Sequence, residues 1–363
     1  MFVDLGRFIV ISSTQFHTLL RFPAKEWNHA ASDEWIELCE ELRGYEWKLS
    51  PQPFPLSRKW ELVSALQKVI RRGDQPLALQ LIAKIEGMRP QEHAYFWRRL
   101  SVIACEDVGA GQEVLTLFVV ACSQIFTPVQ SKAILFDVFG FLVERLCTAT
   151  RRSRTACTVV SIGEMLSADG SRTTLNQADR EILCVIENHA RQFDTPDTPF
   201  QAWQKRNDWR TAGLLKFLNL ALPFPHTLVS CNPPPSAQLH DLPSYSYDMY
   251  TRSGREVLRR LIAGGQAARE ISAILNAPDA RDPLTAVGEA LFFVEGGYVK
   301  GEVEYADLAA FHHRVFAARF GLSESGWSAL RIAMNRIVVD GTIDEMRDRE
   351  LGIRYAQTTL FLA

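Results

Sequence analysis

The stretch RKWELVSALQKVIRRGDQPLALQLIAKIEG, residues 58–87, contains two apolar repeats separated by a short polar turn. Both repeats have the spacing of three and four residues that places side chains on one face of an amphipathic helix. Gly73 can end the first helix, Asp74 is suited to cap the second, and Pro76 falls where a helix tolerates proline. The apolar positions are Trp60, Val63, Leu66, Val69 and Ile70, then Leu77, Ala78, Leu81, Ile82 and Ile85.

A third helix is expected after Pro90, and it leads into FWRRLSVIACEDVGAG at residues 96–111. Its last turn holds Glu106 and Asp107, just before Gly109, although carboxylates are disfavoured at a helix C-terminus. The same three- and four-residue spacing predicts which side chains of this helix face the interior: Phe96, Trp97, Leu100, Ile103 and Ala104.

A nearby cation should offset the cost of those two carboxylates. Arg99 lies two turns before Glu106, and three further cations share one face of the first helix: Lys68, Arg71 and Arg72. Two interpretations follow. One is a salt-bridge latch between the first and third helices. The other is a polar surface that meets DNA or a partner protein.

These residues form two boxes at a defined separation: Ser64-Ala65-x-x-Lys68-x-Ile70-Arg71-x-x-Asp74-x-x-x-Ala78-Leu79-x-x-x-Ala83, and Arg98-Arg99-Leu100-x-x-x-Ala104-x-Glu106-Asp107-x-Gly109. Together they resemble the C-terminal helical region of the RarA/MgsA family, which are replication-associated AAA+ ATPases related to clamp loaders. The resemblance covers roughly residues 58–125. The chain departs from the family pattern at Arg72-Gly73, and at Cys105, where the family tends to have serine.

The resemblance implies a helical bundle like a clamp-loader collar. With the second helical module that the residue pattern predicts beyond it, we expect an all-α fold. The resemblance also implies oligomer formation and DNA-associated work. The ATPase part has no counterpart, because the sequence has no G-x-x-x-x-G-K-[ST] motif and no long β/α half before residue 58. G-x-S-x-G and H-E-x-x-H motifs are also absent. We therefore expect a protein without enzymatic activity and without a cofactor.

The charge balance of the whole chain gives no general attraction to nucleic acid, since the net charge is −2 over 363 residues. Residues 58–99 differ, with nine Lys and Arg against four Asp and Glu, a net charge of +5. A solvated helix face explains this charge as well as a binding surface does. The candidate nucleic-acid contacts are Lys68, Arg71, Arg72, Arg98 and Arg99. We expect Asp74, Glu106, Asp107 and Gly109 to shape the bundle.

The seven cysteines are scattered without a C-x-x-C pair, which is typical of a reducing cytoplasm and disfavours a zinc site. We expect no signal peptide and no membrane-spanning segment. His312 and His313 are adjacent, so they point to different faces of a helix and do not predict a metal pair. Acidic residues at Asp340, Asp344 and Glu345 are more typical of surface turns than of a metal site.

Four segments are expected: an N-terminal arm at 1–55, the collar-like domain at 56–222, a proline-rich linker at 223–243 and a helical module at 244–363. The arm should hold a strand at 8–12, a helix at 34–42 and, at 51–55, either a linker or a strap that lies against the collar-like domain. Apolar helices are expected at 114–126 and 134–146, the second of which is a possible oligomer interface. In the last module, helices are expected at 266–275, 284–295, 305–320 and 323–338.

Two further segments carry weaker signals. The run RRSR at 151–154 is expected to be an exposed loop, or less often a phosphate contact. Trp203 and Trp209 alternate with Lys205, Arg206 and Arg210, a pattern that can stack on single-stranded bases but more often packs internally. An Asp248–Arg252 pair is expected one helical turn apart.

Two functions agree with these patterns. The first is a DNA replication or repair module that oligomerises and binds forked or single-stranded DNA or replication proteins. The alternative is an interaction or decoy protein, which mimics an ATPase collar and binds or blocks a partner.

Overall fold

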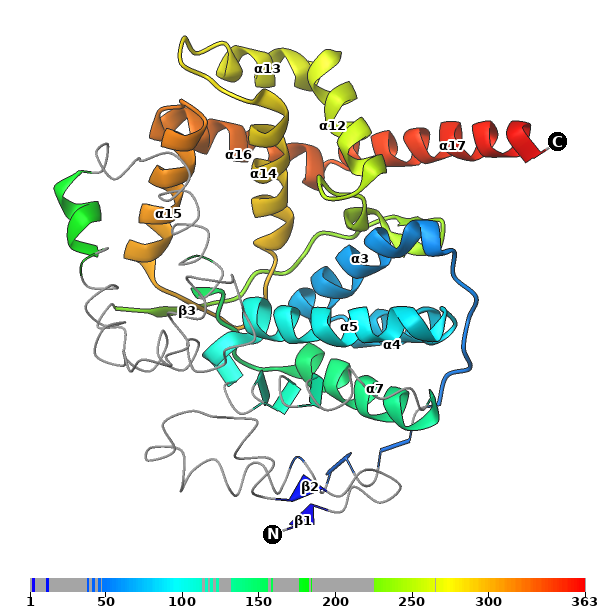
Figure 1. The fold of residues 1–363 in the computed structure, drawn as a ribbon. Helices are drawn as coiled ribbons and strands as arrows, with labels where there is room; N and C mark the ends of the chain where they lie inside the picture. The colour runs from blue at the N-terminus through cyan, green and yellow to red at the C-terminus, as the bar shows by residue number, and fades with distance from the viewer. Residues whose placement is uncertain are drawn as a thin grey trace.

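The computed structural model of the protein is mainly helical (Figure 1). The described chain folds around two apolar cores. The all-α prediction is confirmed. The structure describes these residues: 2–3, 11–12, 38, 41–42, 45–46, 48–112, 115–116, 118–119, 122–123, 132–155, 158, 176–182, 184, 225–264 and 266–362.

The first core lies among four helices: α3 (Lys59–Arg72), α4 (Gln75–Glu86), α5 (Pro90–Ile103) and α7 (Lys132–Thr148). The predicted turn between α3 and α4 is confirmed. Gly73 adopts the left-handed conformation with φ 69°, and the Asp74 carboxylate accepts a hydrogen bond from the Leu77 amide at 3.2 Å. This cap fixes the angle at which α4 leaves α3.

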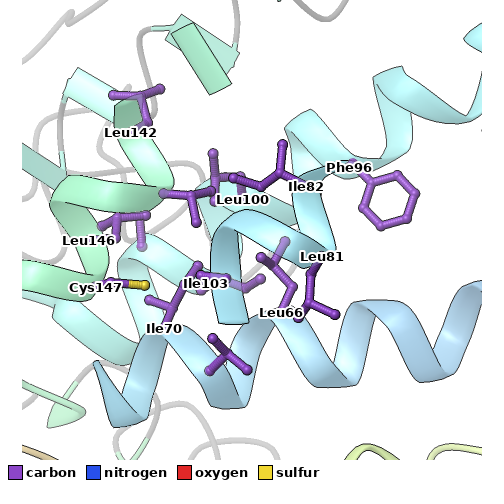
Figure 2. Packing of buried hydrophobic residues seen from close by; sticks show 14 of the residues in the cluster. Leu66, Ile70, Leu81, Ile82, Phe96, Leu100, Ile103, Leu142, Leu146 and Cys147 are labelled. Atoms are coloured by element: carbon purple, nitrogen blue, oxygen red, sulfur yellow. The ribbon is translucent and has the colours of Figure 1, made fainter. Parts of the chain in front are cut away.

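Figure 2 shows how the four helices interlock in this core, with aliphatic side chains from each helix meeting at the centre. The labelled residues are Leu66, Ile70, Leu81, Ile82, Phe96, Leu100, Ile103, Leu142, Leu146 and Cys147. The apolar faces of α7 are buried by the chain itself, over Phe136 to Leu146. Over these residues the segment is therefore a core helix, and the oligomer interface allowed for it stays a prediction.

The end of α5 is irregular. A π-helical turn (Ala104–Val108) and a 3₁₀ turn (Gly109–Gln112) follow it. Gly109 has φ 55°, and a Cβ atom added there would lie 2.4 Å from the carbonyl oxygen of Ser153. The position therefore admits only glycine, both for its backbone conformation and for the closeness of the neighbouring chain.

The second core is formed by helices of the C-terminal module, and it is rich in aromatic residues such as Phe316 and Trp327. The four helices expected there are confirmed within one or two residues. The bounds are α12 (Arg252–Ala263), α13 (Gln266–Leu275), α14 (Pro283–Gly296), α15 (Ala306–Arg319), α16 (Glu324–Val339) and α17 (Thr342–Leu362). The last helix, α17, projects from the body of the molecule (Figure 1) and was not predicted.

The proline-rich stretch is not a free linker over its described part, residues 225–243. Strand β3 (Thr227–Val229) pairs antiparallel with β6 (Glu302–Glu304). Strands β4 (Gln238–Leu239) and β5 (Leu242–Pro243) form a small hairpin whose Leu239 and Leu242 enter the first core. The linker predicted at 223–243 is therefore packed onto the first core over its described part, and the predicted domain bounds stay a prediction.

The N-terminal arm is described in short pieces. Strand β1 (Phe2–Val3) pairs with β2 (Ile11–Ser12), which covers the end of the strand expected at 8–12; residues 8–10 lie outside the described chain. Most residues of the helices expected at 34–42 and at 114–126 also lie outside the described part of the chain. The expected strap is confirmed, since the Gln52 amide donates to the Ala83 carbonyl at 2.9 Å and Phe54 packs on the first core.

In the part of the chain that the structure describes, no helix has both the length and the apolar character needed to cross a membrane.

Candidate functional site

The basic face of α3 is turned inward. Lys68, Arg71 and Arg72 are exposed by only 1%, 3% and 6% of their surface. They share this face because positions three and four residues apart are neighbours on a helix. The 3₁₀ turn η5 (Ser244–Ser246), the residues after it and α14 cover the face. The prediction that these three cations contact DNA is therefore wrong, since the chain itself covers Lys68 and Arg71, and Arg72 borders only a pocket and not the open surface.

Lys68 is held by oxygen atoms from the C-terminal half of the chain. Its Nζ donates to the Tyr245 carbonyl at 2.5 Å and to Asp248 Oδ2 at 2.9 Å, and it lies 3.5 Å from Glu295 Oε2. Ser64 Oγ also donates to Asp248 Oδ2, at 2.6 Å. The carboxylate of Asp248 thus turns toward Ser64 and Lys68 of α3. The sequence had predicted a pair between Asp248 and Arg252.

A second cation completes this group from α17. Arg347 Nη1 lies 2.7 Å from Glu295 Oε1, Nη2 lies 3.2 Å from Oε2, and Nε donates to the Tyr247 carbonyl at 3.0 Å. Burial alone would raise the pKa of Glu295, but Arg347 and Lys68 outweigh it and hold the pKa below its ordinary value. The buried network of Lys68, Asp248, Glu295 and Arg347 thus joins α3 of the first helical bundle to the C-terminal module.

The latch expected between the first and third helices is confirmed. Arg71 Nε lies 2.5 Å from Asp107 Oδ1, and Gln67 Nε2 donates to Glu106 Oε2 at 2.9 Å. Arg99 donates to Gln67 and lies 3.9 Å from Glu106. Burial nevertheless raises the pKa of Glu106 above its ordinary value, against the opposing effect of Arg99. The carboxylates at the end of α5 thus serve helix packing.

The run at 151–154 is also mainly internal. Arg152 is fully buried and its Nη2 donates to the Cys147 carbonyl at 2.7 Å. Arg154 binds the Glu302 carboxylate through Nε and Nη2, at 2.6 and 2.9 Å. The prediction of an exposed loop is wrong for Arg152, because the neighbouring backbone of residues 301–303 pairs with its own backbone.

An exposed aromatic and basic surface lies at the junction of α3 and α5. We call it the Trp60 patch, and it consists of Lys59, Trp60, Tyr95, Arg98 and Arg99. Trp60 is 55% exposed, although its position in the apolar repeat predicted that it would face inward. Its ring meets the Tyr95 ring edge to face at 5.6 Å, and Lys59 Nζ lies 4.7 Å from the Tyr95 centroid.

The cations of the Trp60 patch differ in how they are held. Lys59 pairs with Glu92 at 2.8 Å, and Arg99 is held by Gln67 and Glu106. Arg98 is exposed, and no carboxylate of the described chain forms an ion pair with it. Burial raises the pKa of the Tyr95 hydroxyl, while Arg99, Lys59 and Arg98 act to lower it, so all three cations lie near this ring.

The described residues hold no group of three or more His, Cys, Asp and Glu side chains arranged for a metal ion. His312 is buried among aromatic rings, and burial lowers its pKa to about 3, helped by His313. Asp340 caps the Thr342 amide at 2.9 Å, and Asp344 accepts from the Ala237 amide at 3.1 Å. Trp203, Trp209, Lys205, Arg206 and Arg210 lie outside the described residues.

The sequence analysis did not identify the residues that surround the basic face of α3, and only one of them could have been recognised from the sequence. Glu295 ends an otherwise largely apolar helix, and a carboxylate there requires a cation. Asp248 and Arg347 sit in polar surroundings in the sequence and carry no comparable signal. Comparison with family models, with curated proteins and with solved structures found no match. The likeness to the RarA/MgsA family therefore remains a prediction from its two sequence boxes.

Proposed function

We propose that this chain is a non-enzymatic module of DNA replication or repair that binds single-stranded or forked DNA through the Trp60 patch. The observation that carries the proposal is the 55% exposure of Trp60 beside a second aromatic ring and three cations. The resemblance to the RarA/MgsA collar region is the reason for proposing a role in DNA replication or repair. Of the five basic residues that the sequence predicted to contact DNA, two belong to this patch: Arg98 and Arg99.

Single strands suit this surface because their bases are free to stack. An exposed indole offers a flat apolar face to a base, and each base–aromatic stack contributes roughly 1–3 kcal/mol. Nearby cations attract the phosphates that flank the stacked base. In a duplex the bases are already stacked on each other, so Trp60 has no such contact to make. We therefore expect single strands and fork arms to bind more tightly than duplex.

The strength of binding follows from the charges. Glu92 already neutralises Lys59, and Glu106 lies near Arg99, so Arg98 is the cation best placed for a phosphate. With about one to two phosphate contacts, the salt dependence for a single strand should have a slope of roughly −0.7 to −1.4 on a log–log plot. This predicts modest affinity that weakens gently with salt.

Fluorescence anisotropy of a labelled single strand tests the proposal. Trp60→Ala should weaken binding by about tenfold, which corresponds to the loss of one stack. Arg98→Ala should make the salt slope shallower by about 0.7. Tyr250→Ala and Arg259→Ala are matched controls, because both side chains are well exposed on the other module. Equal binding by wild type and Trp60→Ala would reject the Trp60 patch as the DNA site.

A protein partner is the second candidate, favoured by the composition of the same patch. Trp, Tyr and Arg are the residue types that most often dominate the energy of protein interfaces. In this alternative the chain mimics a collar and joins or blocks an intact RarA-type ATPase. It predicts a mixed complex on size-exclusion chromatography, weakened by Trp60→Ala, together with little DNA binding by the chain alone.

We further propose that the module works in the cytoplasm and as a homo-oligomer. The first rests on the cysteines, since the five that the structure describes are free thiols. The second rests on the resemblance to the collar region alone. The light-scattering mass of the purified chain, with and without forked DNA, tests it: a multiple of the mass of one chain supports the oligomer, and a monomer opposes it.

A further inference from the structure

A pocket of about 370 Å³ lies where the turn between α3 and α4 faces the proline-rich stretch. Arg72, which lines the pocket, is the last residue of α3, whereas Trp60 lies in the first turn of that helix, about 18 Å away along its axis. The lining of the pocket includes the triproline at 233–235, Tyr245 and the start of α4. Its charged lining residues are Arg72, Asp74 and Lys300. The volume is within the range of small-molecule sites, roughly 300–1,000 Å³.

Arg72 is the unusual member of this lining. Only 6% of its surface is exposed, and its guanidinium lies 3.9 Å from the centroid of the Tyr245 ring. In contrast to Lys68 and Arg71 on the same helix face, it has no hydrogen-bond or ion-pair partner among the described residues, and its Nε is buried without an acceptor. A buried guanidinium without an anionic partner is costly, so an anion in the pocket that Arg72 lines would recover part of that free energy.

Two further features favour an anion at this place. Lys300 is exposed at the edge of the pocket, and its Cδ would lie 3.8 Å from a Cβ atom added at Gly73. The start of α4, a helix of 12 residues, also lines the pocket, and a helix N-terminus carries partial positive charge. The Asp74 carboxylate is the opposing charge, and it is engaged by the Leu77 amide.

We propose that this pocket binds a small molecule that carries a phosphate group. The guanidinium of Arg72 donates to the phosphate oxygens from inside, and Lys300 closes the outer side. A phosphate offers three oxygens and up to two negative charges, which match two cations, whereas a carboxylate would be satisfied by Arg72 alone. The triproline and Tyr245 provide an apolar wall for the rest of the ligand.

Thermal unfolding and calorimetric titration with sodium phosphate test the proposal. Phosphate should raise the melting temperature more than sodium chloride of equal ionic strength. Lys300→Gln should weaken phosphate binding by about tenfold, the cost of one charge-assisted contact, whereas Lys48→Gln, at another exposed position, should not. Arg72→Gln is the stronger test if the variant folds; Lys300→Gln is exposed and keeps the test valid if it does not.

A second pair of ligands identifies the source of the phosphate. A larger stabilisation by adenosine monophosphate than by inorganic phosphate would support a phosphate monoester, and equal stabilisation would support free phosphate. Acetate that binds as tightly as phosphate would overturn the ligand class. Unchanged phosphate binding by Lys300→Gln would overturn the site. Single-stranded DNA binding should be the same in Lys300→Gln and wild type, so failure here leaves the proposal for the Trp60 patch untouched.

Discussion

Lys68 is buried, and both carboxylates near its ammonium group come from the C-terminal half of the chain. A charge in such a place is tolerated only when its partners are present, since removal of one partner leaves an uncompensated charge. Lys68→Met should therefore lower the free energy of unfolding by about 3–5 kcal/mol, measured by urea denaturation.

The matched control for Lys68 is Lys59→Met, which breaks an ion pair at the surface and should cost about 1 kcal/mol or less. Equal stability of the Lys68→Met variant and the wild type would show that the basic face of α3 is not held by the C-terminal half.

His312 and His313 give the fold a pH dependence. Burial lowers the pKa of His312 to about 3 and that of His313 to about 4, from an ordinary value of 6.5. As the pH falls below about 6.5, the unfolded chain takes up protons that the folded chain does not. The free energy of unfolding should therefore fall between about pH 6.5 and pH 4.

His312→Phe tests this origin, because a phenyl ring fits the surrounding aromatic residues Phe293 and Phe316 and does not titrate. Urea denaturation at several pH values should give a shallower loss of stability in the variant than in the wild type. Parallel profiles of the two proteins would place the acid sensitivity elsewhere.

At the scale of elements, the end of α5 depends on Gly109. Its positive φ and the Ser153 carbonyl, 2.4 Å from an added Cβ, both oppose a side chain. Gly109→Ala should lower the free energy of unfolding by roughly 1–3 kcal/mol, measured by thermal or urea denaturation. Gly352→Ala on α17 is the control: nothing lies within 4 Å of its added Cβ, so it should be neutral or mildly stabilising. A neutral Gly109→Ala would contradict the geometry of this turn.

The helices themselves were largely predictable, and the faces that they bury were less so. Gly73 and Asp74 predicted the α3–α4 turn because their backbone and capping preferences act locally. The prediction that Trp60 faces inward was wrong. Trp60 lies in the first turn of α3, at the margin of the bundle, where a side chain at an apolar position of the repeat is not necessarily buried by a neighbouring helix. The sequence left open whether the basic face of α3 is buried or exposed. The residues that cover it, 245–248 and Glu295, are distant in the sequence, so no local pattern reveals them.

At the scale of the whole molecule, the two cores are joined by the buried network of Lys68, Asp248, Glu295 and Arg347 and by the proline-rich stretch. The all-α class and the helices α13, α14, α15 and α16 of the last module followed from periodicity, whereas α17 was not predicted. The docking of that module onto α3 did not, because it depends on single polar residues whose partners no local pattern reveals. The consequence for function is that three of the nine cations of residues 58–99, namely Lys68, Arg71 and Arg72, are buried and do not contribute to a surface charge.

The most direct test of the account is lysine labelling followed by mass spectrometry, with and without a single-stranded oligonucleotide. We predict that Lys68 resists labelling in the native protein, that Lys59 reacts and becomes protected by DNA, and that Lys300 reacts equally in both conditions. If Lys68 were labelled as fast as Lys59, the basic face of α3 would not be internal. If saturating DNA left Lys59 unprotected, the Trp60 patch would not be the DNA site.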